Sequence, residues 1–469
     1  MGVKMENIKE NKIGTAPIPK LLFSISVPII ISMLVQALYN IVDSVFVARF
    51  DPNAGTGALT LAFPIQNLII AVSVGLAVGM NALLSRSLGE KNREKATLIA
   101  GQGFFLAFCG YLLFLVFGLF LVKPFVGGQV TEGTLHYEYA YEYISIVSVG
   151  SIGIFIQVVS ERLLQSTGKS MLSMTTQLSG AIVNIILDPI LIFGMFGLPE
   201  MGVRGAAIAT VIGQFVSAAV GVALNVCFNK EIKILIKNFL PKAKLIRDML
   251  VIGIPSIIMQ AIGSVMTYSL NNILLGFSEE ALNAFGVYFK LQSFVFMPIF
   301  GLNSGMVPII AYNYGAKATN RVKKTMRLAM ISAVAYMAFG MLIFQLIPGA
   351  LLSIFNAGEE LLAVGKSALR IISTCFPFAG VSIICSSTCQ ALGKSIYSLY
   401  LSAARQLIIL IPSAYLLALL GQVNLVWLSF PIAEIVALVL AIIFARYVLK
   451  KTMGHYKDAP HEANAPKEV

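Results

Sequence analysis

Two acidic residues, Asp43 and Asp188, stand inside long apolar runs of the 469-residue sequence. Asn184 precedes Asp188 by four residues, so the two side chains face the same way on a helix. Thr210 lies in the apolar run that follows. Carboxylate, amide and hydroxyl oxygens can bind a sodium ion, and two carboxylates at low dielectric favour keeping one of them protonated. These four residues form the predicted cation-coupling site; the alternative is that each is satisfied by a neighbour and serves packing.

Glu161 and Glu434 also stand inside apolar runs. Glu161 lies near the end of its run, which favours a role as a helix cap or loop partner over a role in coupling. Glu434 has no evident partner in the sequence, and its role stays open.

Aromatic and methionine side chains give a softer indication of a binding pocket. Tyr39 lies one helical turn before Asp43. Aromatic rings and thioethers suit flat cationic molecules, although most such residues in an apolar chain simply pack. The predicted substrate-binding residues are Tyr39, Tyr143, Phe155, Met174, Asp188, Met259 and Met266.

The composition indicates that these residues are embedded in lipid. Hydrophobic residues make up 57% of the chain and charged residues only 12%, with a mean hydropathy of +0.84. That charged fraction is about half of what a soluble domain carries. Backbone groups in lipid must pair within helices or a closed barrel, and the apolar runs lack the two-residue alternation of barrel strands. The predicted fold class is therefore an all-α membrane protein.

Breaks at charged residues, glycine and proline divide the chain into twelve predicted transmembrane helices. Their approximate ranges are 20–48, 56–86, 95–122, 137–164, 170–196, 204–228, 245–277, 281–313, 324–352, 361–390, 396–420 and 424–449. Prolines inside these ranges, such as Pro28 and Pro255, can kink a helix, but kinks are common in membrane helices generally.

Basic residues gather in alternate connections between the predicted helices, most densely over 230–247. The connections between them carry acids instead, such as Asp51 and Glu200. Because positive loops stay in the cytoplasm, we expect a multi-pass protein of the inner or plasma membrane with both termini cytoplasmic. This placement accounts for the net charge of +12 without a nucleic-acid partner. The basic first 20 residues lack a short apolar core and a cleavage site, so no removable signal peptide is expected.

The five cysteines lie within or at the edge of the predicted helices. Cys385 and Cys389 are one turn apart and can in principle hold a soft metal, but neither a second pair nor a histidine accompanies them. We interpret them as packing residues. Apart from a transported sodium ion as the alternative to a proton at Asp43, Asn184, Asp188 and Thr210, no metal, no resident cofactor and no disulfide framework is expected.

The two halves of the chain are related by a repeat. The segment from Gly75 to Met80 matches that from Gly301 to Met306 at an offset of 226, and both contain a GxxxG motif. Gln165 matches Gln390 at an offset of 225. An even number of helices per half gives both the same orientation, with a cavity between two six-helix bundles. The predicted divisions are a tail over 1–19, a first bundle over 20–228, a linker over 229–244, a second bundle over 245–449 and a tail over 450–469.

This topology sets the depth of the polar residues. Asp43 lies roughly 8 Å, Thr210 roughly 9 Å and Asp188 roughly 12 Å from the outer ends of their helices. The three side chains therefore share one depth zone, and we expect them to cluster in the first bundle. The positions that match Asp43 in the second half fall near Leu270 and Asn271 and hold no acid, so ion coupling is expected in the first bundle alone.

The sequence resembles the multidrug and toxic compound extrusion (MATE) family over about residues 15–450, and looks closest to its Gram-positive multidrug exporters. The resemblance rests on the pattern from Pro28 to Asp43, the two repeated blocks, and Asn184 with Asp188 and Pro189. It implies two six-helix bundles in a V around a central cavity, and drug efflux driven by a proton or sodium gradient. Asp43, Asn184, Asp188 and Thr210 match the family's cation-site positions. The acids that one branch of the family uses in its second half are not matched.

The predicted function is antiport of a proton or sodium ion against small organic cations, by a protein that contacts membrane lipids and is expected to be a monomer. A flippase for a lipid-linked or amphiphilic cargo is the alternative. An enzyme is disfavoured, because no HExxH motif, close aspartate pair or nucleophile elbow is found.

Overall fold

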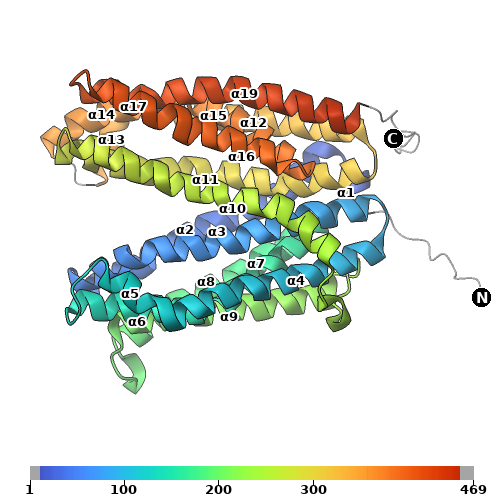
Figure 1. The fold of residues 1–469 in the computed structure, drawn as a ribbon, viewed down its shortest axis with the longest axis horizontal. Coiled ribbons are helices and arrows are strands. Elements are labelled where there is room, and N and C mark those ends of the chain that lie inside the picture. The colour runs from blue at the N-terminus through green and yellow to red at the C-terminus, as the bar shows by residue number, and fades with distance from the viewer. Residues whose placement is uncertain (1–10, 356–357, 455–469) are drawn as a thin grey trace, which may run out of the picture.

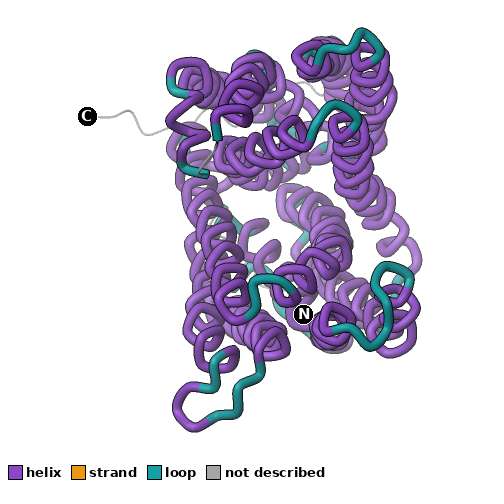
Figure 2. The backbone as a smooth tube through the Cα atoms, turned by 90° about the vertical axis from the view of Figure 1, so that its left-hand side faces the viewer, coloured by secondary structure: helices purple, strands orange, loops and turns teal. Residues whose placement is uncertain are grey.

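The computed structural model describes residues 11–355 and 358–454, and every regular element in these ranges is helical. The first bundle contains α2 (Ile18–Phe50), α3 (Ala54–Gly89), α4 (Arg93–Val116), α6 (Leu135–Val149), α7 (Ile152–Ser166), α8 (Ser170–Ile192) and α9 (Gly202–Phe228). The second contains α10 (Ala243–Leu275), α11 (Glu279–Gly315), α12 (Thr319–Leu346), α14 (Glu359–Ser373), α15 (Phe376–Ala391), α16 (Ser395–Ala403), α17 (Ile411–Ala418) and α19 (Ser429–Met453). The predicted all-α fold class of two bundles is confirmed, and Figures 1 and 2 show the bundles side by side.

Short elements complete the chain and join the long helices. They are α1 (Lys12–Thr15), the π-helical turn η1 (Phe117–Leu121) with α5 (Val122–Gly127), the 3₁₀ turns η2 (Met195–Gly197) and η3 (Ile236–Phe239), α13 (Pro348–Ser353), the π-helical turn η4 (Ala404–Leu410) and α18 (Val423–Trp427). Most of the predicted tails, 1–10 and 455–469, lies outside the described residues.

Ten helical segments of the described chain are long and apolar enough to cross a membrane. Two bent pairs add two more spans: α6 and α7 meet at 46°, and α14 and α15 meet at 47°. With each pair taken as one span, the described residues hold the twelve spans that the sequence predicted. The bends were not predicted. The first falls at Gly150, which caps α6 and on which a Cβ would lie 2.6 Å from Val211 of α9.

The two GxxxG motifs of the repeat pack across the interface between the bundles. A Cβ atom on Gly79 of α3 would lie 2.3 Å from the carbonyl oxygen of Met249 in α10. A Cβ atom on Gly305 of α11 would lie 2.3 Å from Oγ of Ser26 in α2. Each motif therefore lets a helix of one bundle approach the backbone of the other more closely than any larger residue permits.

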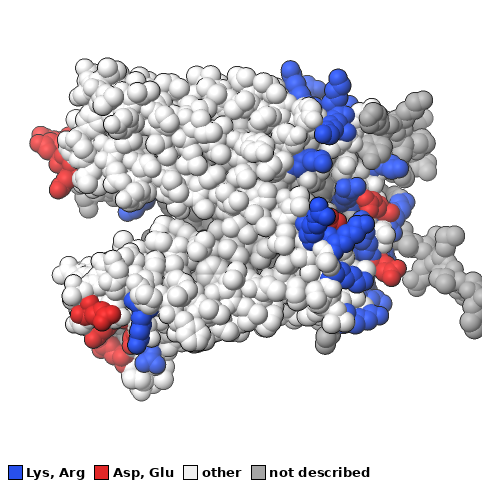
Figure 3. Space-filling view, viewed as in Figure 1, with Lys and Arg blue, Asp and Glu red and all other residues white. Residues whose placement is uncertain are grey.

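Charge divides the molecule into two ends (Figure 3). Lysine and arginine gather at the end where α2 begins and α19 ends, which we call the basic end. The opposite, acidic end includes Asp51 after α2 and Glu279 and Glu280 in the first turn of α11. The space-filling view is hollowed between the bundles at the acidic end, whereas the bundles meet at the basic end. The two bundles thus form a V that opens toward the acidic end.

Residues 11–16 tie the bundles together at the basic end. Arg321 of α12 donates hydrogen bonds to the carbonyl oxygens of Ile13 at 3.0 Å and Ala16 at 2.8 Å. On the other side, Asn11 donates to Glu231, which follows α9. The side chain of Ile13 is completely buried. The start of the first bundle is therefore held by the second.

The connection between the bundles is held by α4. Nε2 of Gln102 donates to the carbonyl oxygens of Asn238 at 2.7 Å and Leu240 at 2.8 Å, and Oε1 accepts from the amide of Lys242 at 2.8 Å. Gln102 itself is fully buried. The connection is thus fixed to the first bundle up to the residue that precedes α10.

Candidate functional site

A polar cavity of about 190 Å³ lies inside the first bundle. Its walls come from α2, α3, α6, α7 and α9, so five of the bundle's helices converge on it. The polar residues that line it are Gln36, Tyr39, Asn40, Asp43, Ser44, Gln66, Asn67, Tyr143, Thr210 and Gln214. One cavity therefore contains four of the predicted site residues: Tyr39, Asp43, Tyr143 and Thr210.

Asn184 and Asp188 lie behind this cavity on α8. Nδ2 of Asn184 donates to Oδ1 of Asp188 at 3.2 Å, as their spacing of four residues predicted. Asp188 is completely buried, and Asp43 acts on it electrostatically. Asn184 also lies beside Gly213 of α9: a Cβ added to Gly213 would be 3.2 Å from Cβ of Asn184. Gly213 is the residue before Gln214, which lines the cavity. The structure thus brings all four predicted cation-coupling residues together.

Four oxygen atoms around this point are buried and find no hydrogen-bond partner among the described residues. They are Oδ1 of Asp43, Oδ1 of Asn184, Oδ2 of Asp188 and Oε1 of Gln214. Each unsatisfied buried acceptor costs about 1–3 kcal/mol. A set made of acceptors alone, two of them carboxylates, is complementary to a proton or a small cation. Oδ1 of Asp188 has a protein donor in Asn184, whereas Oδ2 of Asp188 and Oδ1 of Asp43 have none among the described residues.

Glutamine and asparagine residues that sequence reasoning missed complete the cavity. Gln66 donates to the hydroxyl of Tyr143 at 2.8 Å, and Gln177 donates to Gln36 at 2.7 Å. The available signal was the spacing along α2, where Gln36, Tyr39, Asn40 and Asp43 recur at three and four residues and so share a face. Sequence reasoning weighed acids most heavily, because their cost in lipid is larger than that of amides.

The remaining predicted substrate residues lie elsewhere. Phe155 is buried in the core of the first bundle, with its ring 6.0 Å from that of Phe114. Met174 is half-buried on α8. Met259 and Met266 are half-buried on α10 of the second bundle, where Sδ of Met259 lies 4.0 Å from Nε2 of Gln390. None of these four lines the cavity that contains Asp43.

The two further acids differ from their sequence interpretation. Glu161 is not a helix cap, since it lies inside α7 and accepts a hydrogen bond from Gln157 one turn earlier at 3.0 Å. Glu434, which had no evident partner, forms an ion pair with Arg405 at 3.1 Å. That partner is 29 residues away on another helix, a distance at which a single sequence gives no signal.

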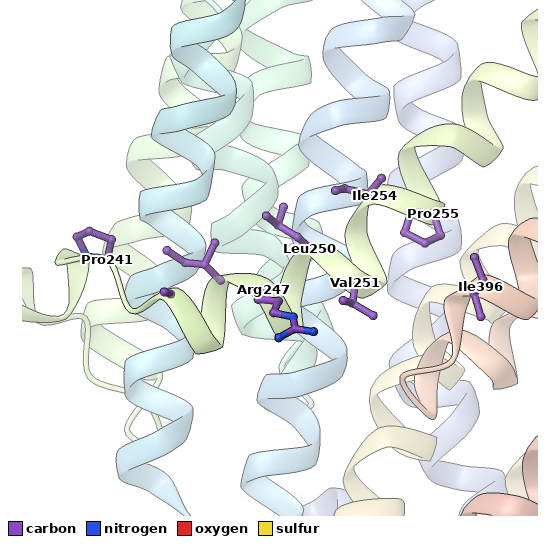
Figure 4. Close-up of a pocket in the computed structure, with 9 residues that line it drawn as sticks. Pro241, Arg247, Leu250, Val251, Ile254, Pro255 and Ile396 are labelled. Carbon is purple, nitrogen blue, oxygen red and sulfur yellow. The ribbon is translucent and has the colours of Figure 1, made fainter.

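A larger hollow of about 940 Å³ lies along α10, with a different character (Figure 4). Apolar side chains such as Leu250, Val251 and Ile254 line it, together with Ile396 of α16 and one charged residue, Arg247. It lacks the carboxylate and amide oxygens of the first-bundle cavity. The smaller cavity is therefore the one equipped to bind a cation. The described residues contain no cluster of three histidine, cysteine or acidic residues, and Cys385 and Cys389 are buried.

These features define a multi-pass membrane protein built from two repeated bundles with a polar cavity in the first. The model of the MatE family matches residues 28–190 and again residues 255–416, once in each bundle. The chain therefore belongs to the MatE family, and the duplication read from the sequence is confirmed.

Two relatives and one solved structure illustrate the similarity. The chain is 27% identical over 436 residues to the multidrug export protein MepA of Staphylococcus haemolyticus, which covers 92% of this chain and 94% of the relative. It is 28% identical over 364 residues to the probable multidrug resistance protein NorM of Thermotoga maritima, 76% of each chain. An outward-facing multidrug resistance MATE family transporter of the MOP superfamily has a TM-score of 0.87 at 23% identity and covers 96% of this chain and 100% of that one. The solved structure shows that the fold is shared.

Proposed function

We propose that this protein is a cation-coupled antiporter that exports small organic cations across the cell membrane by alternating access. The observation that carries the proposal is the set of four buried, unpartnered oxygens of Asp43, Asn184, Asp188 and Gln214. A set of buried acceptors without protein donors, two of them carboxylates, is suited to a bound proton or small cation. Relatives named as multidrug export and multidrug resistance proteins support the cargo class.

The charge distribution supports an orientation for this transport. Basic segments stay in the cytoplasm, so the basic end and both termini face inward in this proposal. The V then opens toward the outside, which is the state that releases cargo. Both bundles come from one chain, so a monomer is sufficient for the cycle.

Coupling follows from competition for the same charges. With the cavity open to the cytoplasm, ionised Asp43 and Asp188 attract an organic cation, and the rings of Tyr39 and Tyr143 offer it flat apolar faces. With the cavity open to the outside, a proton or sodium ion enters and neutralises the carboxylates. The loss of negative charge disfavours the bound cargo, which leaves.

The test is uptake of a fluorescent organic cation into inverted membrane vesicles that contain the protein. A proton gradient and a sodium gradient are imposed separately, on wild type and on Asp43→Asn. We expect uptake that one gradient drives and that the variant loses. The exposed variant Glu359→Gln is the control and should behave as wild type. Absence of gradient-driven uptake in wild type would contradict antiport and favour the flippase.

A further inference from the structure

The second bundle contains an ion pair deep within its spans. Nη1 of Arg405 lies 3.1 Å from Oε1 of Glu434, and their side chains are 23% and 12% exposed. Arg405 comes ten residues after Ser395, the first residue of α16, which is roughly 15 Å along a helix. Ionisable residues at such a depth are costly in lipid, and they generally serve a function together with a partner.

Only one of the two carboxylate oxygens of Glu434 has a partner in this ion pair. Its Oε2 is buried and has no hydrogen-bond partner among the described residues. Besides Arg405 of η4, the titratable groups that act on Glu434 are Tyr288 of α11 and Cys375, which precedes α15. The other helices packed against α19 carry these titratable groups: Cys385 and Cys389 on α15, Tyr397 and Tyr400 on α16, Tyr415 on α17, and Glu359, Glu360, Lys366 and Arg370 on α14.

A proton suits the free oxygen better than a metal cation does. A sodium ion beside Oε2 would lie close to the guanidinium of Arg405, which repels it, and a single carboxylate offers few ligands. A proton needs only one oxygen and no further coordination. Protonation of Glu434 also cancels the attraction that holds Arg405, so the two events are linked.

The helix that carries Arg405 has a built-in irregularity. Arg405 is the second residue of η4, a π-helical turn between α16 and α17. π-helical turns interrupt α-helices at functional sites more often than elsewhere. A change from π to α winding shifts the register by one residue, which turns a side chain by about 100° around the helix axis. Such a change would carry the guanidinium of Arg405 away from Glu434.

The repeat places this pair on the helices that correspond to those of the first site. At the offset of 225 that relates Ser170 to Ser395, Arg405 corresponds to Gly180 of α8. In the first bundle α8 carries Asp188, and α9 adjoins it. In the second bundle the segment from α16 to α17 carries Arg405, and α19 adjoins it with Glu434. The sequence comparison missed this because it considered only positions that match Asp43.

We propose that Glu434 is a second proton-binding carboxylate of the transport cycle, with Arg405 as the counter-ion that releases it. This inference rests on the proposed antiport. When η4 moves Arg405 away, Glu434 takes up one proton and becomes a neutral carboxylic acid; when Arg405 returns, the proton leaves. Arg405 keeps its charge throughout, so the pair alternates between net charge zero and plus one.

The second proton has an electrical consequence. One proton exchanged at the first site for one monovalent organic cation moves no net charge across the membrane. With Glu434 as a second carrier, each cycle moves one net positive charge against the direction of the cargo. A membrane potential of 100 mV then raises the accumulation ratio of the cargo by about 50-fold, which corresponds to 2.3 kcal/mol per charge.

The first experiment measures transport of a monovalent fluorescent cation into inverted vesicles at fixed pH gradient, with the potential set by potassium and valinomycin. We compare wild type with the double variant Arg405→Gln and Glu434→Gln, which removes both charges and leaves neither unpaired. We expect an inside-positive potential to increase accumulation in wild type. In the double variant the response to the potential should vanish while the response to the pH gradient remains. A double variant that keeps the wild-type response to the potential would overturn the proposal and make the pair structural.

A second measurement is independent of transport. Infrared difference spectra of the purified protein are recorded across a pH titration, for wild type, Glu434→Gln and the exposed control Glu359→Gln. We expect wild type and the control to show a carboxylic-acid C=O band that Glu434→Gln lacks. If all three spectra share the same bands, Glu434 does not take up a proton. If wild-type vesicles show no gradient-driven uptake, the antiport proposal fails, and these spectra still decide whether Glu434 binds a proton.

Discussion

The two bundles share one repeated architecture but place their buried acids in different surroundings. The first bundle gathers Asp43, Asn184 and Asp188 around a cavity and leaves oxygens without donors. In the second, Glu434 has the counter-ion Arg405, and the rings of Phe285 and Trp427 stack with centroids 6.4 Å apart. A duplicated scaffold therefore fixes where helices run without fixing what they carry. The first copy places its acids beside a cavity, whereas the second pairs Glu434 with Arg405 and leaves only Oε2 of that carboxylate without a donor.

The comparison is tested most severely at Asp188. The equivalent residue of the second bundle, at the offset of 225, is Ser413. We expect Asp188→Asn to abolish gradient-driven accumulation of cargo, because the coupled ion loses its main ligand. Wild type should gain about tenfold accumulation per pH unit for each proton exchanged, since one unit corresponds to 1.36 kcal/mol, and therefore about 100-fold if Glu434 carries a second proton. The measurement is steady-state accumulation in inverted vesicles.

The control for this prediction is Ser413→Asn, which should retain the wild-type dependence on the gradient. Equal losses in both variants would show that the bundles contribute alike and would remove the distinction between them. Retained coupling in Asp188→Asn would place the first-bundle site elsewhere.

A smaller effect is expected where helices α8 and α9 meet. A Cβ on Gly180 would lie 2.0 Å from Oγ of Ser217 and 2.5 Å from the carbonyl oxygen of Gly213. Gly180→Ala should therefore lower the free energy of unfolding by about 1–3 kcal/mol, the usual cost of overpacking. Thermal unfolding in detergent measures this. Gly286→Ala in the second bundle is the control, because nothing lies within 4 Å of its Cβ position; a similar decrease there would mean that the close approach at Gly180 is not the cause.

The smallest effect concerns a charge outside both bundles. Partial burial raises the pKa of Glu231, and the hydrogen bond from Asn11 and the charges of Lys169 and Arg93 oppose this shift. A carboxyl whose pKa is raised in the folded protein stabilises the fold most when protonated, and that contribution is lost as the pH rises through the folded pKa. Glu231→Gln should thus be slightly more stable than wild type at pH 7 and equal to it at pH 4, by denaturant unfolding. A difference that is larger at pH 4 would reverse the sign and contradict this assignment.

Hydropathy and charge were sufficient to predict the fold and part of the site. Long apolar runs need helices, and the repeat at Gly75 and Gly301 required two bundles; the depth of Asp43 and Asp188 placed them together. The bends at Gly150 and before α15 were beyond prediction, because they depend on which neighbour crosses there. Gln66 and Gln214 were missed since amides cost less in lipid than acids do. The partner of Glu434 depends on helix packing, which one sequence does not reveal.

Gln102 restricts how the connection between the two bundles can move. Its side chain forms hydrogen bonds with the backbone of Asn238, Leu240 and Lys242, so the end of the long connection after α9 is fixed to α4. The part of the connection that is not bonded to the first bundle therefore begins only at Ala243, the first residue of α10. In the proposed alternating access, residues 238–242 would therefore move together with the first bundle, and the linker could bend only from Ala243 onward.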